Sequence, residues 1–133
     1  MKKPTAVLAE VAVALGAAAS VAALGAPTAS AAVTGITVAP GRTIGLHDYG
    51  TGCSYTVTAT VDDSAQVYFF EEGQGPTGFA DATPVDGTAT VTWTPSRTAT
   101  TYLFAAQAGG NVWPRVPVDV GTGINLGSAC VAL

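Results

Sequence analysis

Residues 55–61 read YTVTATV, so apolar and hydroxyl side chains alternate along most of the stretch. Residues 88–94, TATVTWT, repeat this alternation, and Pro95 ends it because proline lacks the N–H group that a β-ladder needs. A period of two is that of a strand whose side chains point alternately to the two faces of a sheet. Both stretches therefore predict strands with one buried face and with threonines facing solvent.

Further strands are predicted on both sides of these two. Residues 33–39 and 116–120 also alternate, and Pro117 suits the second of them to a sheet edge. Residues 66–71 and 102–106 are apolar on both faces, which is typical of central strands. These segments indicate an all-β fold.

Short turns rich in Asp, Gly and Asn separate the predicted strands, and the longer stretch 73–85 is expected to be a surface loop or an irregular edge strand. About seven short strands with such spacing are typical of a β-sandwich. We expect one domain at residues 32–121, followed by a C-terminal tail at 122–133.

The first 31 residues differ from the rest. Lys2 and Lys3 precede an Ala/Val/Leu-rich stretch at 6–26, and small residues follow up to Ala31. This order predicts a cleavable secretory signal peptide at 1–31 and a secreted, extracellular product. A membrane anchor is the alternative, but Glu10 and the glycines suit it poorly, so no stable membrane insertion is expected after cleavage.

After cleavage, three arginines face eight acidic side chains, and three minus eight gives a net charge of −5 with no lysine. The arginines are Arg42, Arg97 and Arg115. A phosphate backbone requires clustered cations, which three scattered arginines do not supply. Nucleic acid is therefore not an expected partner.

Residues 87–95, 102–105 and 116–120 together resemble the last three strands of bacterial immunoglobulin-like domains, over about a third of the mature chain. The resemblance implies an immunoglobulin-like β-sandwich and an exported or surface location. It implies no catalytic residue. The strand that holds Phe104 lacks the second core cysteine of antibody domains.

Cys53 and Cys130 are the two cysteines, and in an exported protein they are predicted to pair. The bridge would pin the tail to the sandwich. A redox-active pair would show a CxxC spacing, which the chain lacks.

Catalysis is not predicted. His47 lies beside Asp48 and near Ser54, but adjacent residues of an extended segment point to opposite faces, so we expect a lone, solvated loop histidine. Paired acids at 62–63 and 71–72 could bind calcium if they met, yet turn chemistry explains the first pair with fewer assumptions. No metal or cofactor is expected.

The candidate binding surface consists of Trp113, Tyr68 and Phe70. Trp113 lies beside a Gly-Gly-Asn turn, where it could anchor a partner or a sugar or cover the end of the core. Most other aromatic residues lie on predicted strands, and Phe69, Trp93 and Phe104 are expected in the core.

The sequence thus favours a secreted, non-enzymatic immunoglobulin-like module with a binding or cell-envelope role. Its partner would be an unknown protein, a glycan or a small apolar ligand. One alternative is a carrier of a small apolar ligand, because acidic exported sandwiches of the neocarzinostatin type are of similar size; their four-cysteine pattern is absent here. The other alternative is an inhibitor of an extracellular enzyme that presents the loop at 73–85.

Overall fold

The computed structural model describes residues 32–133, which form eleven strands and no helix. The all-β prediction is therefore confirmed. The predicted signal peptide at 1–31 lies outside the described residues. Within residues 32–133, no helix is long and apolar enough to cross a membrane.

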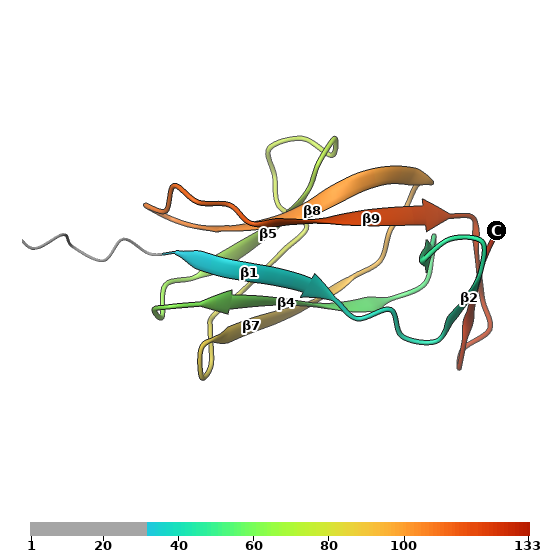
Figure 1. The fold of residues 1–133 in the computed structure, drawn as a ribbon, viewed down its shortest axis with the longest axis horizontal. Coiled ribbons are helices and arrows are strands. Elements are labelled where there is room, and N and C mark those ends of the chain that lie inside the picture. Colours follow the sequence, from blue (N-terminus) through green and yellow to red (C-terminus); the bar gives the residue numbers. More distant parts are fainter. Residues whose placement is uncertain (1–31) are drawn as a thin grey trace, which may run out of the picture.

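Two antiparallel arrays form the body of the molecule (Figure 1). The three-stranded sheet has the order β1-β4-β7, and its strands are β1 (Val33–Val38), β4 (Tyr55–Val61) and β7 (Thr88–Trp93). The five-stranded sheet has the order β3-β9-β8-β5-β6, and its strands are β3 (Tyr49–Gly50), β9 (Arg115–Gly121), β8 (Ala99–Gln107), β5 (Val67–Glu71) and β6 (Ala80–Ala82). Within these two sheets, only the short β3 runs parallel to its neighbour, β9. All six predicted strands lie in these two sheets, and β6 gives the stretch at 73–85 its edge strand.

A third sheet closes one end of the molecule. It has the order β10-β11-β2, and its strands are β10 (Gly123–Asn125), β11 (Cys130–Ala132) and β2 (Thr43–Gly45). The expectation of about seven strands was too low, because β2, β3, β10 and β11 have only two or three residues each and no alternating pattern of their own. The tail at 122–133 supplies two of these four.

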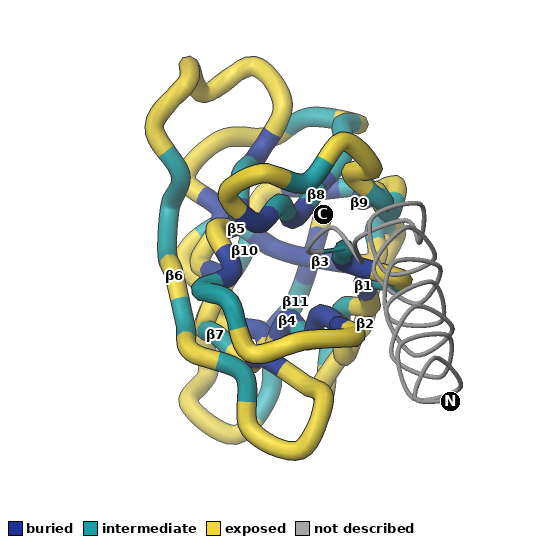
Figure 2. Tube along the Cα trace, turned by 90° about the vertical axis from the view of Figure 1, so that its left-hand side faces the viewer, coloured by how far each residue is buried: buried dark blue, intermediate teal, exposed yellow. Residues whose placement is uncertain are grey.

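The core lies between the two larger sheets, where the tube is buried along its inner side (Figure 2). Along β4 and β7 the apolar residues are mostly buried and most threonines are exposed, as the alternation predicts. Phe69 and Trp93 are buried as expected. Phe104 is not: it points to the outer face of the five-stranded sheet and is half-buried. That prediction was wrong because 102–106 is apolar on both faces, and only the inward set of a strand enters the core.

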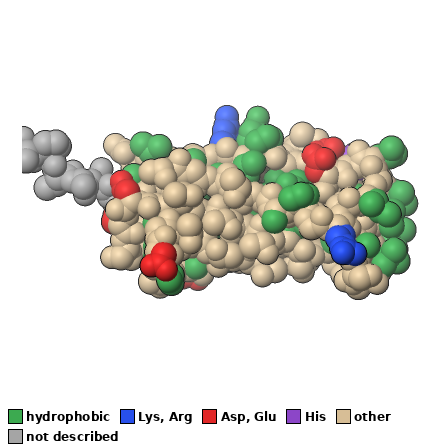
Figure 3. Space-filling view, turned by 60° about the horizontal axis from the view of Figure 1, so that its bottom comes forward, with side chains coloured by type: hydrophobic (Ala, Val, Ile, Leu, Met, Phe, Trp, Pro, Cys, Tyr) green, Lys and Arg blue, Asp and Glu red, His purple; other side chains and the backbone are tan. Residues whose placement is uncertain are grey.

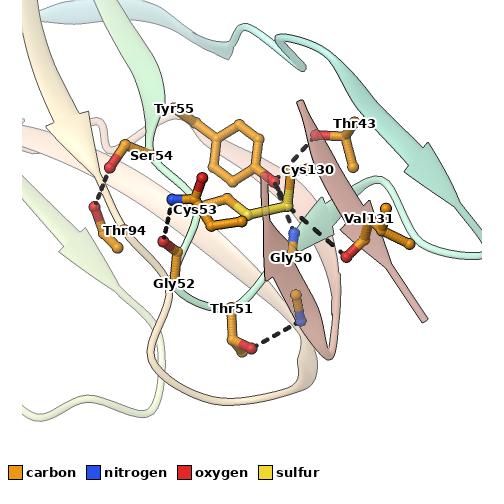
Figure 4. The surroundings of a disulfide bond; sticks show 12 residues. Thr43, Gly50, Thr51, Gly52, Cys53, Ser54, Tyr55, Thr94, Cys130 and Val131 are labelled. Carbon is orange, nitrogen blue, oxygen red and sulfur yellow. Dashed lines mark hydrogen bonds between the residues drawn. A yellow bond between two sulfur atoms is a disulfide. The ribbon is translucent and has the colours of Figure 1, made fainter. Parts of the chain in front are cut away.

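A disulfide joins Cys53 to Cys130, with a sulfur–sulfur distance of 2.05 Å (Figure 4). The predicted bridge is confirmed, and it ties β11 in the tail to the loop before β4. Beside it, the Tyr55 hydroxyl donates a hydrogen bond to Cys130 Sγ at 3.4 Å and accepts one from the Gly50 N–H at 2.8 Å. The end sheet is thus held covalently and by hydrogen bonds to the body.

Candidate binding surface on the five-stranded sheet

The outer face of the five-stranded sheet carries aromatic side chains at its centre. In the β5–β8 ladder Phe70 lies opposite Phe104, and Tyr68 lies opposite Ala106. The residues between them, such as Phe69 and Ala105, are buried in the core, so the aromatic set points outward. We call Tyr68, Phe70, Phe104 and Trp113 the aromatic face.

Three of these rings form a row. The centroids of Phe70 and Phe104 are 5.0 Å apart with 14° between the planes, and those of Phe104 and Trp113 are 6.2 Å apart with 15°. Trp113 comes from the segment before β9, where its Nε1 donates to the Gly110 carbonyl at 3.4 Å. Its side chain is 58% exposed, so it covers no part of the main core. Apolar area of this kind is what a binding partner covers.

An apolar pocket of about 280 Å³ adjoins the row of rings. Its lining residues are Phe70, Phe104, Ala106 and Trp113 from the sheet side, and Gly75 and Pro76 from the loop between β5 and β6. The loop is held tightly to β5, because the Phe79 N–H donates to the Phe69 carbonyl at 2.8 Å. No charged side chain lines the pocket, so it suits an apolar group.

The structure therefore brings Phe70 and Trp113 together at one pocket, and Tyr68 lies on the same sheet face outside it. The sequence missed the central member, Phe104. Phe104 could have been placed on this face from its position opposite Phe70 in the antiparallel β5–β8 ladder. The register of that ladder cannot be read from the sequence alone.

A second, more polar hollow of about 390 Å³ shares Phe104 and Trp113 with the apolar pocket, and Glu72 and Arg115 also line it. Arg115 Nη1 lies 3.4 Å from Glu72 Oε2, and both side chains are more than half exposed. The Arg115 guanidinium also lies 4.2 Å from the centroid of the Tyr102 ring. Exposed pairs of this kind stabilise little and exchange partners readily.

His47 lies in the loop between β2 and β3 and is partly exposed, as expected, but it is not a lone residue, and that part of the expectation is corrected. Its Nδ1 lies 3.0 Å from Asp119 Oδ2, and the Thr100 hydroxyl donates to Asp119 Oδ1 at 3.2 Å. Asp119 lies 72 positions away in the sequence, so the pair could not be foreseen. A triad also needs a hydroxyl or thiol on the histidine. Among residues 32–133 none hydrogen-bonds to His47; Ser54 bonds to Thr94 instead.

The paired acidic residues do not converge. Asp63 Oδ1 accepts the Ala65 N–H at 3.0 Å, which is the turn chemistry that the sequence predicts. Glu71 is buried and accepts the Trp93 indole N–H at 3.0 Å. In the described part of the chain, no three His, Cys, Asp or Glu side chains are grouped so as to hold a metal ion.

Tyr49 lies in a buried aromatic cluster. Its ring packs edge-on against Tyr55, with centroids 4.9 Å apart, and against Trp93 at 5.4 Å. Burial raises the pKa of the Tyr49 hydroxyl above 10.0, and Asp48 and Tyr55 add smaller contributions in the same direction. The cluster lies in the core, so this pKa shift concerns stability.

Comparison of the chain with protein-family models, with curated proteins and with solved structures found no match. The functional argument therefore rests on the geometry of the aromatic face and its two hollows.

Proposed function

We propose that this chain is a secreted, non-enzymatic binding module with an immunoglobulin-like sandwich fold, and that the aromatic face is its binding surface. The order of its main strands supports the fold assignment. One sheet contains the first, second and fifth main strands (β1, β4, β7), and the other contains the seventh, sixth, third and fourth (β9, β8, β5, β6). Immunoglobulin domains divide their strands between two sheets in a closely similar way.

One observation carries the binding role: three near-parallel aromatic rings on an outer sheet face border an apolar pocket that nothing in the described chain fills. A fully exposed threonine face would serve the fold equally well, since the core lies on the other side of the sheet. Aromatic anchors that combine ring area with little side-chain entropy are characteristic of binding surfaces.

The secreted location is supported by the disulfide, because such bridges persist in oxidising compartments. Intact mass spectrometry of the protein from culture medium tests it. We expect a chain that begins at Ala32 and gains about two hydrogens on reduction. A full-length mass with free thiols would contradict the location.

Retention on fractions of the producing organism tests the binding role. The cell envelope and the secreted proteins would be immobilised separately, and retention of the wild type would be compared with two double variants. Phe70→Ser with Trp113→Ser alters the aromatic face. Ile44→Ser with Ile124→Ser is the matched control, because it alters two exposed apolar residues of the end sheet.

The two sites are well separated on the molecule. Exposed hydrophobic side chains gather at the end that carries β2 (Figure 3), and neither Ile44 nor Ile124 lines either hollow of the aromatic face. We expect the first double variant to lose retention and the control to keep it. Equal retention of all three proteins, or loss in the control alone, would refute the aromatic face as the binding surface.

A second candidate function is the carriage of a small apolar ligand, which the volume and apolar lining of the pocket favour. Native mass spectrometry of protein purified from its own host distinguishes the two. A carrier retains an additional ligand mass, whereas a binding module does not.

A further inference from the structure

We infer that the aromatic face takes an aromatic side chain from a basic, extended segment of a partner protein, with a cationic side chain of the same segment placed at Glu72. This inference rests on the proposed function, because it names the partner class of the same surface. It is carried by the two hollows that share the Phe104–Trp113 ridge.

The volume of the apolar pocket sets the size of the group it accepts. An apolar cavity of about 150 Å³ holds a benzene molecule, so about 280 Å³ has room for one large aromatic side chain and not for a bulky assembly. The near-parallel rings of Phe70, Phe104 and Trp113 favour a flat group that can stack on or against them. A charged group would lose its hydration there without gaining a partner.

The position of the second hollow favours a chain over a single small molecule. Both hollows are lined by Phe104 and Trp113, so they adjoin the same two side chains. Side chains on the same face of an extended segment are two residues, or about 6.6 Å, apart, which lets one residue fill the apolar pocket while the residue two positions away reaches the second hollow. A lone aromatic molecule would use only the first hollow.

The charge of the protein indicates that the group at the second hollow is a cation. The mature chain has a net charge of −5, which favours a basic partner at long range. Locally, Arg97 is held by the Glu72 carbonyl at 3.1 Å and by Glu71, and Arg115 is held by Glu72 and by the Tyr102 ring. The Glu72 carboxylate itself is half-exposed and has only the 3.4 Å contact with Arg115. An incoming lysine or arginine can therefore bind Glu72 while Arg115 stays over Tyr102.

Three capped peptides, each with its charged residues two positions from the central residue, test the inference on residues 32–133: Ac-KAWAK-NH2, Ac-EAWAE-NH2 and Ac-KAAAK-NH2. Their binding is measured by ¹⁵N NMR titration, which gives affinities and maps the amides that shift. We expect Ac-KAWAK-NH2 to shift amides of β5 and β8 and of residues 110–115. Loss of the ring should weaken binding about tenfold. Reversal of the charge should weaken it about fivefold at low salt, and this difference should shrink as salt rises.

Matched variants place the peptide. Ala106→Leu fills the apolar pocket and should weaken binding of Ac-KAWAK-NH2 about tenfold, whereas Ala108→Leu adds the same side chain at an exposed turn outside the pocket and should leave binding unchanged. Glu72→Gln should remove the preference for the basic peptide and keep the preference for the ring. Unchanged ¹⁵N spectra confirm that each variant is folded.

Several outcomes would overturn the inference. Equal affinity for Ac-KAWAK-NH2 and Ac-KAAAK-NH2 would show that no ring enters the pocket. Equal affinity for Ac-KAWAK-NH2 and N-acetyltryptophanamide would show a site for isolated rings and favour the carrier. If none of the peptides binds while retention on the fractions still depends on Phe70 and Trp113, the proposed function stands and the inferred class of partner is wrong. If both experiments fail, both proposals are wrong.

Discussion

Removal of the Cys53–Cys130 disulfide should strongly destabilise the domain. The variant is Cys53→Ala with Cys130→Ala, which opens a link between residues 77 positions apart. The chain-entropy relation for a loop of this length gives about 4.5 kcal/mol, acting through the unfolded state. That is a large share of the roughly 5–15 kcal/mol by which small domains are stable, so the variant should be marginal at room temperature.

Urea unfolding followed by tryptophan fluorescence measures this loss. For a slope of about 1.5 to 2 kcal/mol per molar urea, the midpoint should fall by about 2 to 3 M. Treating the wild type with a reductant should give a similar fall, and the same reductant should leave the double variant unchanged, which separates the bridge from the lost sulfur contacts. A loss below about 1 kcal/mol by both routes would refute the claim that the bridge constrains the unfolded chain.

Three smaller predictions concern single side chains. Trp93→Phe should lower the free energy of unfolding by about 1 to 3 kcal/mol, because it leaves the buried Glu71 carboxylate without the indole donor. Trp113→Phe at the surface should lower it by less than about 0.5 kcal/mol. Equal losses for the two variants in urea unfolding would contradict this prediction. Because burial raises the pKa of the Tyr49 hydroxyl in the folded state, its contribution to stability is complete below pH 10.0 and is lost as the pH rises through the higher folded pKa. Tyr49→Phe should therefore flatten the fall in melting temperature at alkaline pH, and an unchanged slope would refute this prediction. His47→Ala should lower the free energy of unfolding by less than about 1 kcal/mol, because the His47–Asp119 pair is partly exposed. The wild type and this variant should show the same background rate in esterase and peptidase assays. Hydrolysis by the wild type that the variant abolishes would refute the non-enzymatic assignment.

The sequence predicted the long strands well because their pattern is local. Residues 55–61 form β4 with the predicted bounds, and 88–94 differ from β7 by one residue. The pattern fails for β2, β3 and β10, whose glycine-rich segments become strands only through pairing with distant partners. For example, β2 pairs with β11, some 87 positions later. Such pairing is a tertiary effect that no local period records.

The candidate site was predicted in part, for a related reason. Trp113 and Phe70 were expected on a binding surface, and both line the apolar pocket. Phe104 was assigned to the core, because a strand that is apolar on both faces does not reveal which face another layer covers. The His47–Asp119 pair and the polar hollow beside Glu72 both depend on contacts between residues far apart in the sequence. Such contacts form only in the folded chain.

The central claim is that the aromatic face is the surface through which this protein binds. Amide hydrogen exchange, measured on the wild-type chain free and bound to the fraction that retains it, tests the claim most directly. The account predicts slower exchange in β5, β8 and residues 110–115, with no change in β2, β10 or β11. Protection confined to the end sheet, or to the edge of β7, would contradict it.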